Sequence, residues 1–145
     1  GQDSRHGMGP GCLSCIDATQ SGDITETGKV WQSFDVQRSF SSAAVADGLV
    51  FIAEYKGILR CLDAETGRGH WEHDLKGRVF ASPLVADGKV YIGDESGKVT
   101  VAAAAKEKAI LHEVKMDGAV YATPVAANGV LYIASQKSLF AIRAK

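Results

Sequence analysis

Short apolar runs alternate with turn-forming residues along most of this 145-residue chain, and their spacing predicts β-strands. Residues 44–52 show the pattern clearly, because an Ala-Val-Ala run and a Leu-Val-Phe-Ile run flank an Asp-Gly pair. Such a pair between two apolar runs is typical of a tight hairpin, since both turn residues tolerate positive φ. Val, Ile, Phe and Tyr in the runs favour strands. Residues 102–105 would suit a helix, but they fall at the end of a predicted strand, so the pattern indicates an all-β chain.

The hairpin is part of a repeat. Asp47-Gly48 recurs as Asp87-Gly88 and again as Asn128-Gly129, at spacings of 40 and 41 residues. Trp31 recurs as Trp71, also 40 residues on. A fixed period of this length predicts one supersecondary unit that stacks against copies of itself.

Each complete repeat adds a third and a fourth run to the hairpin, such as residues 58–62 and 69–74. Four short antiparallel strands in about 40 residues are typical of one β-propeller blade. The pattern predicts thirteen strands, or about three blades. After a flexible segment at 1–11, we expect a half blade at 12–37, complete blades at 38–77 and 78–118, and an incomplete blade at 119–145.

One segment carries a family resemblance. Residues 63–71, Asp-Ala-Glu-Thr-Gly-Arg-Gly-His-Trp, resemble the tryptophan-docking motif of quinoprotein propellers, the repeat family named after pyrroloquinoline quinone (PQQ). An interrupted copy of the motif runs from Asp17 to Trp31. The third repeat has lost the motif, and Leu111 stands where the Trp is expected. The resemblance covers residues 12–142 and implies a PQQ-like β-propeller.

The motif has a structural rationale. Thr66 and Gly67 form a tight turn in which Gly supplies positive φ. Asp63 can accept hydrogen bonds from the turn N–H groups, and Trp71 can bury its ring against the neighbouring blade. The residues expected to serve in this structural docking are Asp17, Gly28, Trp31, Asp63, Thr66, Gly67 and Trp71.

Charge and hydropathy narrow the classes of partner. The net charge is −1 at pH 7, which argues against nucleic acid or an anionic membrane as partner. The apolar runs are too short to span a bilayer, so we expect no membrane insertion. Residues 1–11 are polar and Gly-rich, which is not the composition of a signal peptide. A periplasmic or other extracytoplasmic location is implied by the family resemblance alone.

A complete propeller has four to eight blades, and the predicted strands do not close a ring. Two alternatives stay open: the chain is a portion of a longer propeller, or two copies assemble. In a homodimer, the two strands before residue 39 could complete the last blade of a second copy, with two-fold symmetry.

Two enzymatic activities are candidates for a propeller of this type. Quinoprotein dehydrogenases hold PQQ and calcium in the funnel of an eight-bladed ring, and the ligand positions cannot be matched here, so PQQ is not expected. A calcium-dependent, lactonase-like hydrolase acting on small cyclic esters is the main enzymatic alternative, because calcium prefers six to eight oxygen ligands and can polarise a carbonyl. The candidate metal ligands are Asp47, Asp87, Asp94 and Glu95, with Glu54 and Asn128 as further candidates.

Each candidate ligand also has a structural interpretation. Hairpin turns account for Asp47, Asp87 and Asn128, and solvated strand ends account for Glu54 and for residues 94–95. The sequence also predicts a channel whose candidate ligand is a small molecule. The residues predicted to line it are Arg38, Ser41, Arg78, Ser82, Tyr121 and Thr123. The two arginines match across the repeat, which suits either an anion in the channel or exposed arginines that bury only their stems.

The three cysteines are Cys12, Cys15 and Cys61. Cys12 and Cys15 lack the following His of a haem site and the second ligand pair of a zinc site. Buried thiols and one incidental disulfide both fit the sequence. Taken together, the sequence favours a PQQ-like propeller module that acts as a binding scaffold without PQQ. The calcium-dependent hydrolase is the alternative hypothesis, and a portion of a PQQ-dependent dehydrogenase is the third.

Overall fold

The structure is a computed structural model that describes residues 11–143. The predicted flexible segment, apart from Gly11, lies outside the described residues. The described chain contains thirteen strands in four antiparallel sheets, in agreement with the all-β prediction. The strands are β1 Leu13–Ile16, β2 Lys29–Ser33, β3 Ala44–Ala46, β4 Leu49–Ala53, β5 Ile58–Asp63, β6 Gly69–Asp74, β7 Leu84–Ala86, β8 Lys89–Gly93, β9 Lys98–Ala103, β10 Ile110–Lys115, β11 Val125–Ala127, β12 Val130–Ala134 and β13 Leu139–Arg143.

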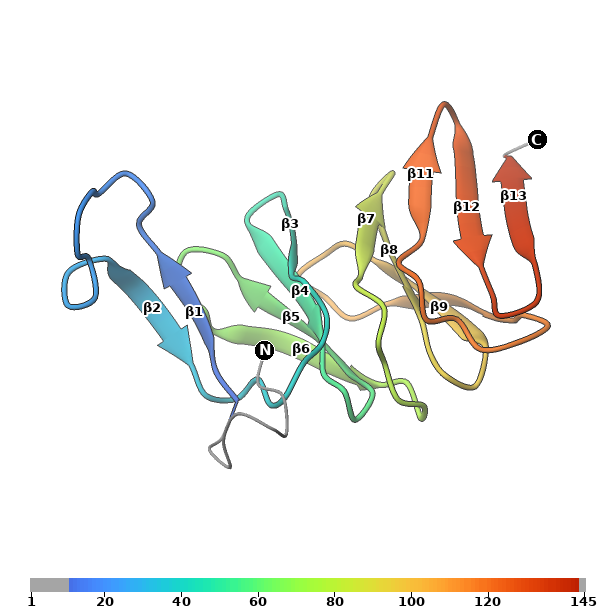
Figure 1. Ribbon diagram of the computed structural model, residues 1–145, viewed down its shortest axis with the longest axis horizontal. Helices are drawn as coiled ribbons and strands as arrows, with labels where there is room; N and C mark the ends of the chain where they lie inside the picture. The colour runs from blue at the N-terminus through green and yellow to red at the C-terminus, as the bar shows by residue number, and fades with distance from the viewer. Residues whose placement is uncertain (1–10, 144–145) are drawn as a thin grey trace.

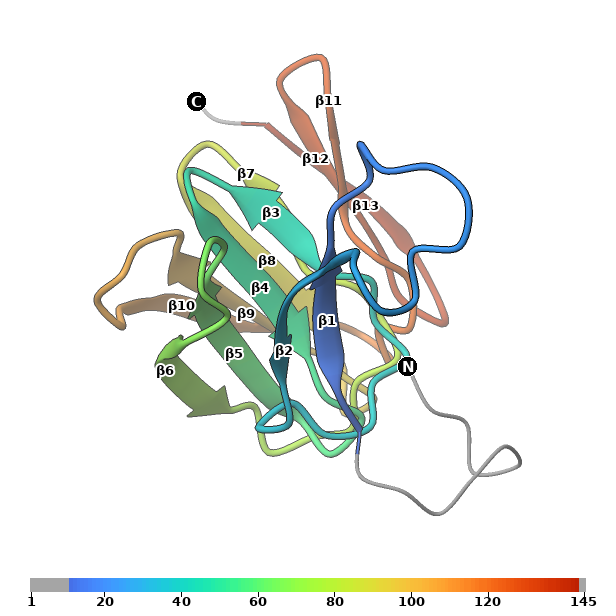
Figure 2. The same cartoon turned by 90° about the vertical axis from the view of Figure 1, so that its left-hand side faces the viewer.

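The sheets are propeller blades arranged in a row. Strands β3 to β6 form one four-stranded meander and β7 to β10 form the next, each pairing only with its neighbours in sequence. A two-stranded sheet of β1 and β2 precedes them and a three-stranded sheet of β11 to β13 follows. Figure 1 shows the four sheets side by side in chain order, and Figure 2 looks along the row. The described residues thus form about three blades of a partial propeller. Closure of the ring by further blades or by a second copy stays a prediction.

The predicted Asp/Asn-Gly hairpins join the first two strands of each blade. Asp47, Asp87 and Asn128 have φ values of 49°, 50° and 52°, and the Gly after each also has positive φ. Positive φ at both central residues is the geometry that matches the right-handed twist of the flanking strands. These turns lie at one end of the blades, and the linkers that enter β3 and β7 lie at the other end (Figure 1).

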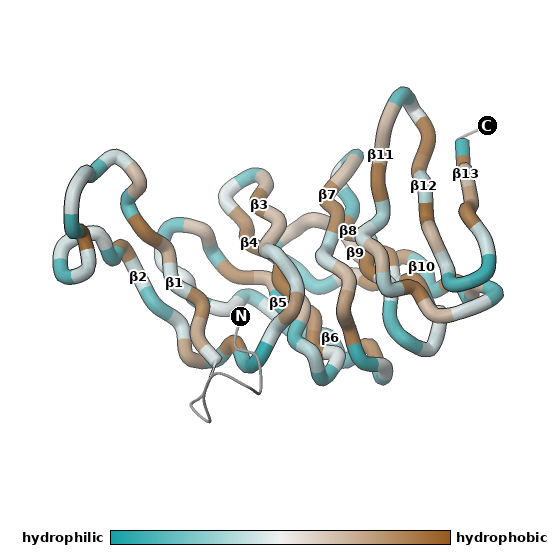
Figure 3. The backbone as a smooth tube through the Cα atoms, in the orientation of Figure 1, coloured by the Kyte–Doolittle hydropathy of each residue, from teal (hydrophilic) through white to brown (hydrophobic). Residues whose placement is uncertain are grey.

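The main core lies between the two complete blades. Phe51 and Leu59 of one blade pack with Val90 and Ile92 of the next, and all four are essentially inaccessible to solvent. Figure 3 shows the apolar residues concentrated along the strands and the hydrophilic residues at the hairpin turns. Blade-on-blade packing, rather than any single sheet, therefore buries most of the apolar surface. Among the described residues, no helix is long and apolar enough to cross a membrane.

Candidate functional site

The two tryptophans fasten neighbouring blades at the hairpin end. Trp31 in β2 donates its Nε1–H to the carbonyl of Ala64 at 2.9 Å, and its ring lies over Gly67 in the next blade. A Cβ at Gly67 would lie 2.4 Å from the Trp31 ring, so only Gly allows this contact. Trp71 repeats the arrangement one blade on, donating to the carbonyl of Ala105 at 2.9 Å.

The aspartates of the motif organise the turns of their own sheets, and the Asp63 turn is the one that receives the Trp31 ring. The Asp63 carboxylate accepts hydrogen bonds from the hydroxyl and the backbone N–H of Thr66, and these hold the pKa of Asp63 below its usual value. Asp17 accepts the same pair of bonds from Thr19, which lowers its pKa in the same way. Gly28, the equivalent turn Gly of the first sheet, lies against Ile24. These contacts have a structural role, because they hold the turns in place.

The third blade has no tryptophan at the docking position, and the sequence pattern misplaced that position by one residue. The register pairs Trp71 with Cys61 and, one blade on, His112 with Val101. His112 therefore occupies the Trp position, and the expectation of Leu111 there was wrong. The turn between β9 and β10 is one residue longer than the turn between β5 and β6, which shifts the register.

The structure does not gather the candidate calcium ligands. Asp47 and Asp87 lie on hairpin turns at one end of the blades, whereas Asp94 and Glu95 lie in the β8–β9 turn at the other. Asp87 accepts a hydrogen bond from Lys89 at 2.9 Å, and this bond lowers the pKa of the carboxyl group. Within residues 11–143, no three His, Cys, Asp or Glu side chains are grouped so that they could hold a metal ion.

Two of the carboxylates interpreted as solvated strand ends are buried. Glu54 and Asp94 are each 2 % exposed and occupy the same position in successive blades. Asp94 Oδ1 accepts hydrogen bonds from the backbone and hydroxyl of Ser96. Glu54 instead accepts one from Arg60 Nε at 2.6 Å. Their burial corrects the sequence interpretation, and both carboxylates are engaged in holding their own blades.

The predicted channel residues with hydroxyl groups connect the linkers of neighbouring blades. Ser41 Oγ donates to the carbonyl of Ala81 at 2.6 Å, and the backbone N–H of Ser42 donates to Ser82 Oγ at 2.9 Å. The N–H of Ser82 in turn donates to Thr123 Oγ1 at 2.9 Å. Each of these bonds joins residues that are one repeat apart. Their role in lining a closed channel stays a prediction.

An aromatic ladder runs across the same linkers. Phe40 and Phe80 stack with ring centroids 5.8 Å apart, and Phe80 meets Tyr121 edge-on at 5.3 Å. Tyr55, in the β4–β5 turn, contacts the edges of both phenylalanines at 5.3 and 5.5 Å. Phe40, Phe80 and Tyr121 are 39–44 % exposed, so the ladder is a surface feature.

Two arginines lie over these rings. The Arg38 guanidinium carbon is 4.8 Å from the Phe40 centroid and 5.1 Å from that of Tyr55, and that of Arg78 is 5.7 Å from Tyr55. These are cation–π distances. We call the whole surface the linker face, and it consists of Arg38, Phe40, Tyr55, Arg78, Phe80 and Tyr121.

Only part of the linker face was predicted from the sequence. Arg38, Arg78 and Tyr121 were expected along a channel, but no role was predicted for Phe40 or Tyr55. A usable signal was present, because Phe40, Phe80 and Tyr121 recur at spacings of 40 and 41 residues, as the hairpin turns do.

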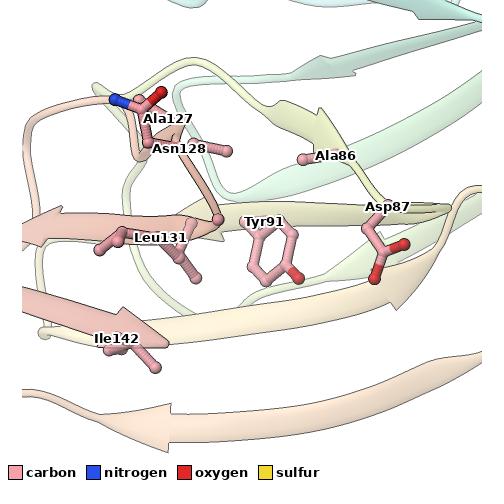
Figure 4. Close-up of a pocket in the computed structure, with 10 residues that line it drawn as sticks. Ala86, Asp87, Tyr91, Ala127, Asn128, Leu131 and Ile142 are labelled. Atoms are coloured by element: carbon pink, nitrogen blue, oxygen red, sulfur yellow. The ribbon is translucent and has the colours of Figure 1, made fainter. Parts of the chain in front are cut away.

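A cavity of about 470 Å³ lies between the third and last sheets, near their hairpin turns. Figure 4 shows Tyr91 and Asp87 of one blade facing Leu131 and Ile142 of the next, with Asn128 at the rim. Its volume suits a small molecule. Its lining is mostly apolar, with Asp87, Tyr91 and Asn128 as the polar side chains.

All three cysteines are free thiols in the structure. Cys15 pairs with Trp31 as Cys61 pairs with Trp71, as their shared repeat position implies. Cys12 is exposed, whereas Cys61 is buried, and burial raises its pKa to about 11.

We therefore expect iodoacetamide at pH 8 to alkylate Cys12 in the native protein and to leave Cys61 unmodified. The thiolate is the reactive form, and Cys61 is both protonated and inaccessible at that pH. Peptide mapping by mass spectrometry measures both sites, with the urea-unfolded chain as the control in which both react. Equal alkylation of the two thiols in the native protein would contradict the buried placement of Cys61.

These features define a class: a β-propeller whose blades carry the quinoprotein type of repeat, fastened by docked tryptophans. The chain belongs to the family described as outer membrane protein assembly factor BamB, which matches residues 13–115. A search of curated proteins finds no match.

Solved structures share the fold. BamB from Moraxella catarrhalis aligns with a TM-score of 0.68 and 22 % identity over 79 % of this chain and 36 % of that one. A europium-containing methanol dehydrogenase aligns at 0.57 and 21 % identity, over 74 % and 22 % of the two chains. The quinohemoprotein alcohol dehydrogenase ADHIIG from Pseudomonas putida HK5 aligns at 0.52 and 22 % identity, over 63 % and 20 %. This chain thus spans about a third of the BamB structure, and at these identities the likeness shows the fold.

Proposed function

We propose that this chain is a BamB-type propeller module that works as a binding scaffold, in the periplasm or another extracytoplasmic compartment, without PQQ. The compartment is supported by membership of the BamB family. Two complete blades joined by buried packing and by Trp71 provide a rigid base. A scaffold needs such a base and an exposed surface for its partner.

The observation that carries the proposal is the exposed linker face. Surface-exposed aromatic residues that contact one another, flanked by arginines, are typical of protein-binding sites, where Tyr, Phe and Arg are enriched. Phe40, Phe80 and Tyr121 come from three successive linkers and meet at one surface. By contrast, the carboxylates considered for a hydrolase are spread over both ends of the blades.

The proposal predicts a partner contact at position 80. The protein is produced in its own cellular compartment with benzoylphenylalanine at position 80. On irradiation, this residue is expected to crosslink to a defined partner. The matched control is the same residue at position 45, which is exposed and apolar but lies on β3, outside the linker face. The same partner, identified by mass spectrometry, should be lost when Phe40 is changed to Ser.

A hydrolysis assay tests the enzymatic alternative on the same preparation. We expect no turnover of a small lactone above buffer, with or without calcium. Turnover that disappears with a chelator, combined with equal crosslinking from positions 80 and 45, would replace the scaffold proposal with the calcium-dependent hydrolase.

A further inference from the structure

The two arginines of the linker face occupy equivalent positions but have different neighbours. The carbonyl of Arg38 accepts a hydrogen bond from the N–H of Tyr55, and the carbonyl of Arg78 accepts the same bond from Glu95. Tyr55 and Glu95 are therefore the same repeat position in successive blades. One blade places an aromatic ring beside its arginine, and the next places a carboxylate there.

Among residues 11–143, this difference leaves Arg38 without a carboxylate partner. Arg78 Nε lies 3.7 Å from Glu95 Oε1. Arg38 lies over the rings of Phe40 and Tyr55, and its Nε is buried with no hydrogen-bond partner among the described residues. Because this Nε–H is covered by the protein itself, a carboxylate from outside pairs with the terminal Nη groups of the guanidinium, where two donors lie side by side.

The rest of the surface suits an acidic partner with apolar side chains. Lys56, which follows Tyr55 in the β4–β5 turn, is exposed and adds a cation to that turn. Glu95 is the carboxylate of the neighbouring turn, and it already lies beside Arg78. The exposed rings of Phe40 and Phe80 offer apolar contact beside the guanidinium.

We propose that the linker face binds an acidic segment of another protein chain, with a carboxylate of that segment on the Arg38 guanidinium. The partner's apolar or aromatic side chains then lie on Phe40, Phe80 and Tyr121. The proposal rests on the scaffold function and adds the chemistry of the partner. Arg is suited to this role because its planar fork pairs with a carboxylate through two parallel hydrogen bonds. In the next blade, Arg78 has a carboxylate from the same chain, that of Glu95, whereas Arg38 would take its carboxylate from the partner.

Single-stranded nucleic acid is the competing occupant, because bases also stack on aromatic residues beside arginine. Such sites combine stacking with a positively charged groove that follows the backbone phosphates. Here the net charge is −1 and Glu95 already lies beside Arg78, so the charge pattern favours a single carboxylate on Arg38 over a run of phosphates.

The test is an NMR titration of the full 15N-labelled chain with two matched peptides. The acidic peptide is N-acetyl-Phe-Asp-Leu-Glu-Phe-amide, and its neutral twin replaces Asp and Glu with Asn and Gln. We expect the acidic peptide to shift the Arg38 Nε–H signal and the amides of Phe40 and Phe80. Its affinity should exceed that of the twin by about tenfold, as is typical of a charge-assisted hydrogen bond.

Variants locate the effect. Arg38→Gln should remove the preference for the acidic peptide, and Arg38→Lys, which keeps the charge but loses the fork, should retain only part of it. Arg68→Gln is the matched control, because Arg68 is exposed and lies in the β5–β6 turn, outside the linker face. It should bind as the unmodified chain does. An unchanged amide spectrum outside the linker face establishes that each variant is folded.

The outcomes separate this inference from the scaffold proposal. Equal affinity for the two peptides at the linker face overturns the carboxylate preference and leaves the scaffold function standing. Absence of shifts at the linker face, or tighter binding of a six-nucleotide oligothymidylate than of the acidic peptide, overturns the inference. Crosslinking from position 80 then decides the scaffold function separately.

Discussion

Replacing Trp71 with Ala is expected to lower the free energy of unfolding by about 3 kcal/mol, at the lower end of the range for large aromatic-to-Ala changes because the residue is partly exposed. The ring packs against the main core with its centroid 6.1 Å from that of Phe51. The substitution also removes the hydrogen bond that Nε1 donates to Ala105, leaving a carbonyl without its partner. The hydrogen bond joins one blade to the next, and the ring lines the core that the two complete blades share, so the substitution weakens the junction between them.

Urea unfolding followed by far-ultraviolet circular dichroism measures the effect. Trp71→Phe is the control, because it keeps one aromatic ring in the core while it removes the Nε1–H donor and the second ring of the indole. It should cost about 1 kcal/mol, the usual net value of one hydrogen bond, together with any cost of repacking. If Trp71→Ala stays within 1 kcal/mol of the unmodified chain, the ring does not fasten the blades as described.

The hairpins and the tryptophan dock were predictable because each depends on residues close together in sequence. Asp47-Gly48 and its two repeats specify a turn through their tolerance of positive φ, and the structure has positive φ at each. The Thr66–Gly67 turn is likewise local, since Asp63 folds back on it within three residues. Where the local pattern changed length, before β10, the prediction was one residue off.

The linker face was predicted only in part because its contacts form between blades. Phe40 and Phe80 are 40 residues apart, and whether they stack depends on how one blade sits on the next. No periodicity within a single blade reports that distance. The burial of Glu54 was missed for a similar reason. Its position at the end of a strand suggests exposure, whereas the folded chain buries it beside Arg60.

Replacing Arg60 with Ala is expected to destabilise the chain by about 3 kcal/mol or more, because it leaves the buried Glu54 carboxylate without its cation. The Glu54 side chain is 3 % exposed, and Arg60 Nε lies 2.6 Å from its Oε1. Arg60 Nη1 also reaches Glu72 at 2.7 Å, but the Glu72 side chain is 62 % exposed. Exposed ion pairs contribute about 0 to 1 kcal/mol, so Glu72→Ala is the matched control with a small expected effect.

The next blade indicates why the arginine is needed at this position. Asp94 occupies the place of Glu54, and its shorter side chain folds back onto its own turn, where one carboxylate oxygen accepts bonds from Ser96 and from the N–H of Lys98. Glu54 is one methylene longer than Asp94 and extends away from its turn to Arg60. The blade that contains Asp94 has Thr100 in place of the arginine. The double substitution Glu54→Asp with Arg60→Thr copies the short carboxylate and the Thr of this arrangement, although Lys56 stands in place of Ser96 and supplies only its backbone N–H. It should recover part of the stability lost in Arg60→Ala. Urea unfolding of the four chains measures this, and a double variant no more stable than Arg60→Ala would show that the turn alone cannot hold the carboxylate.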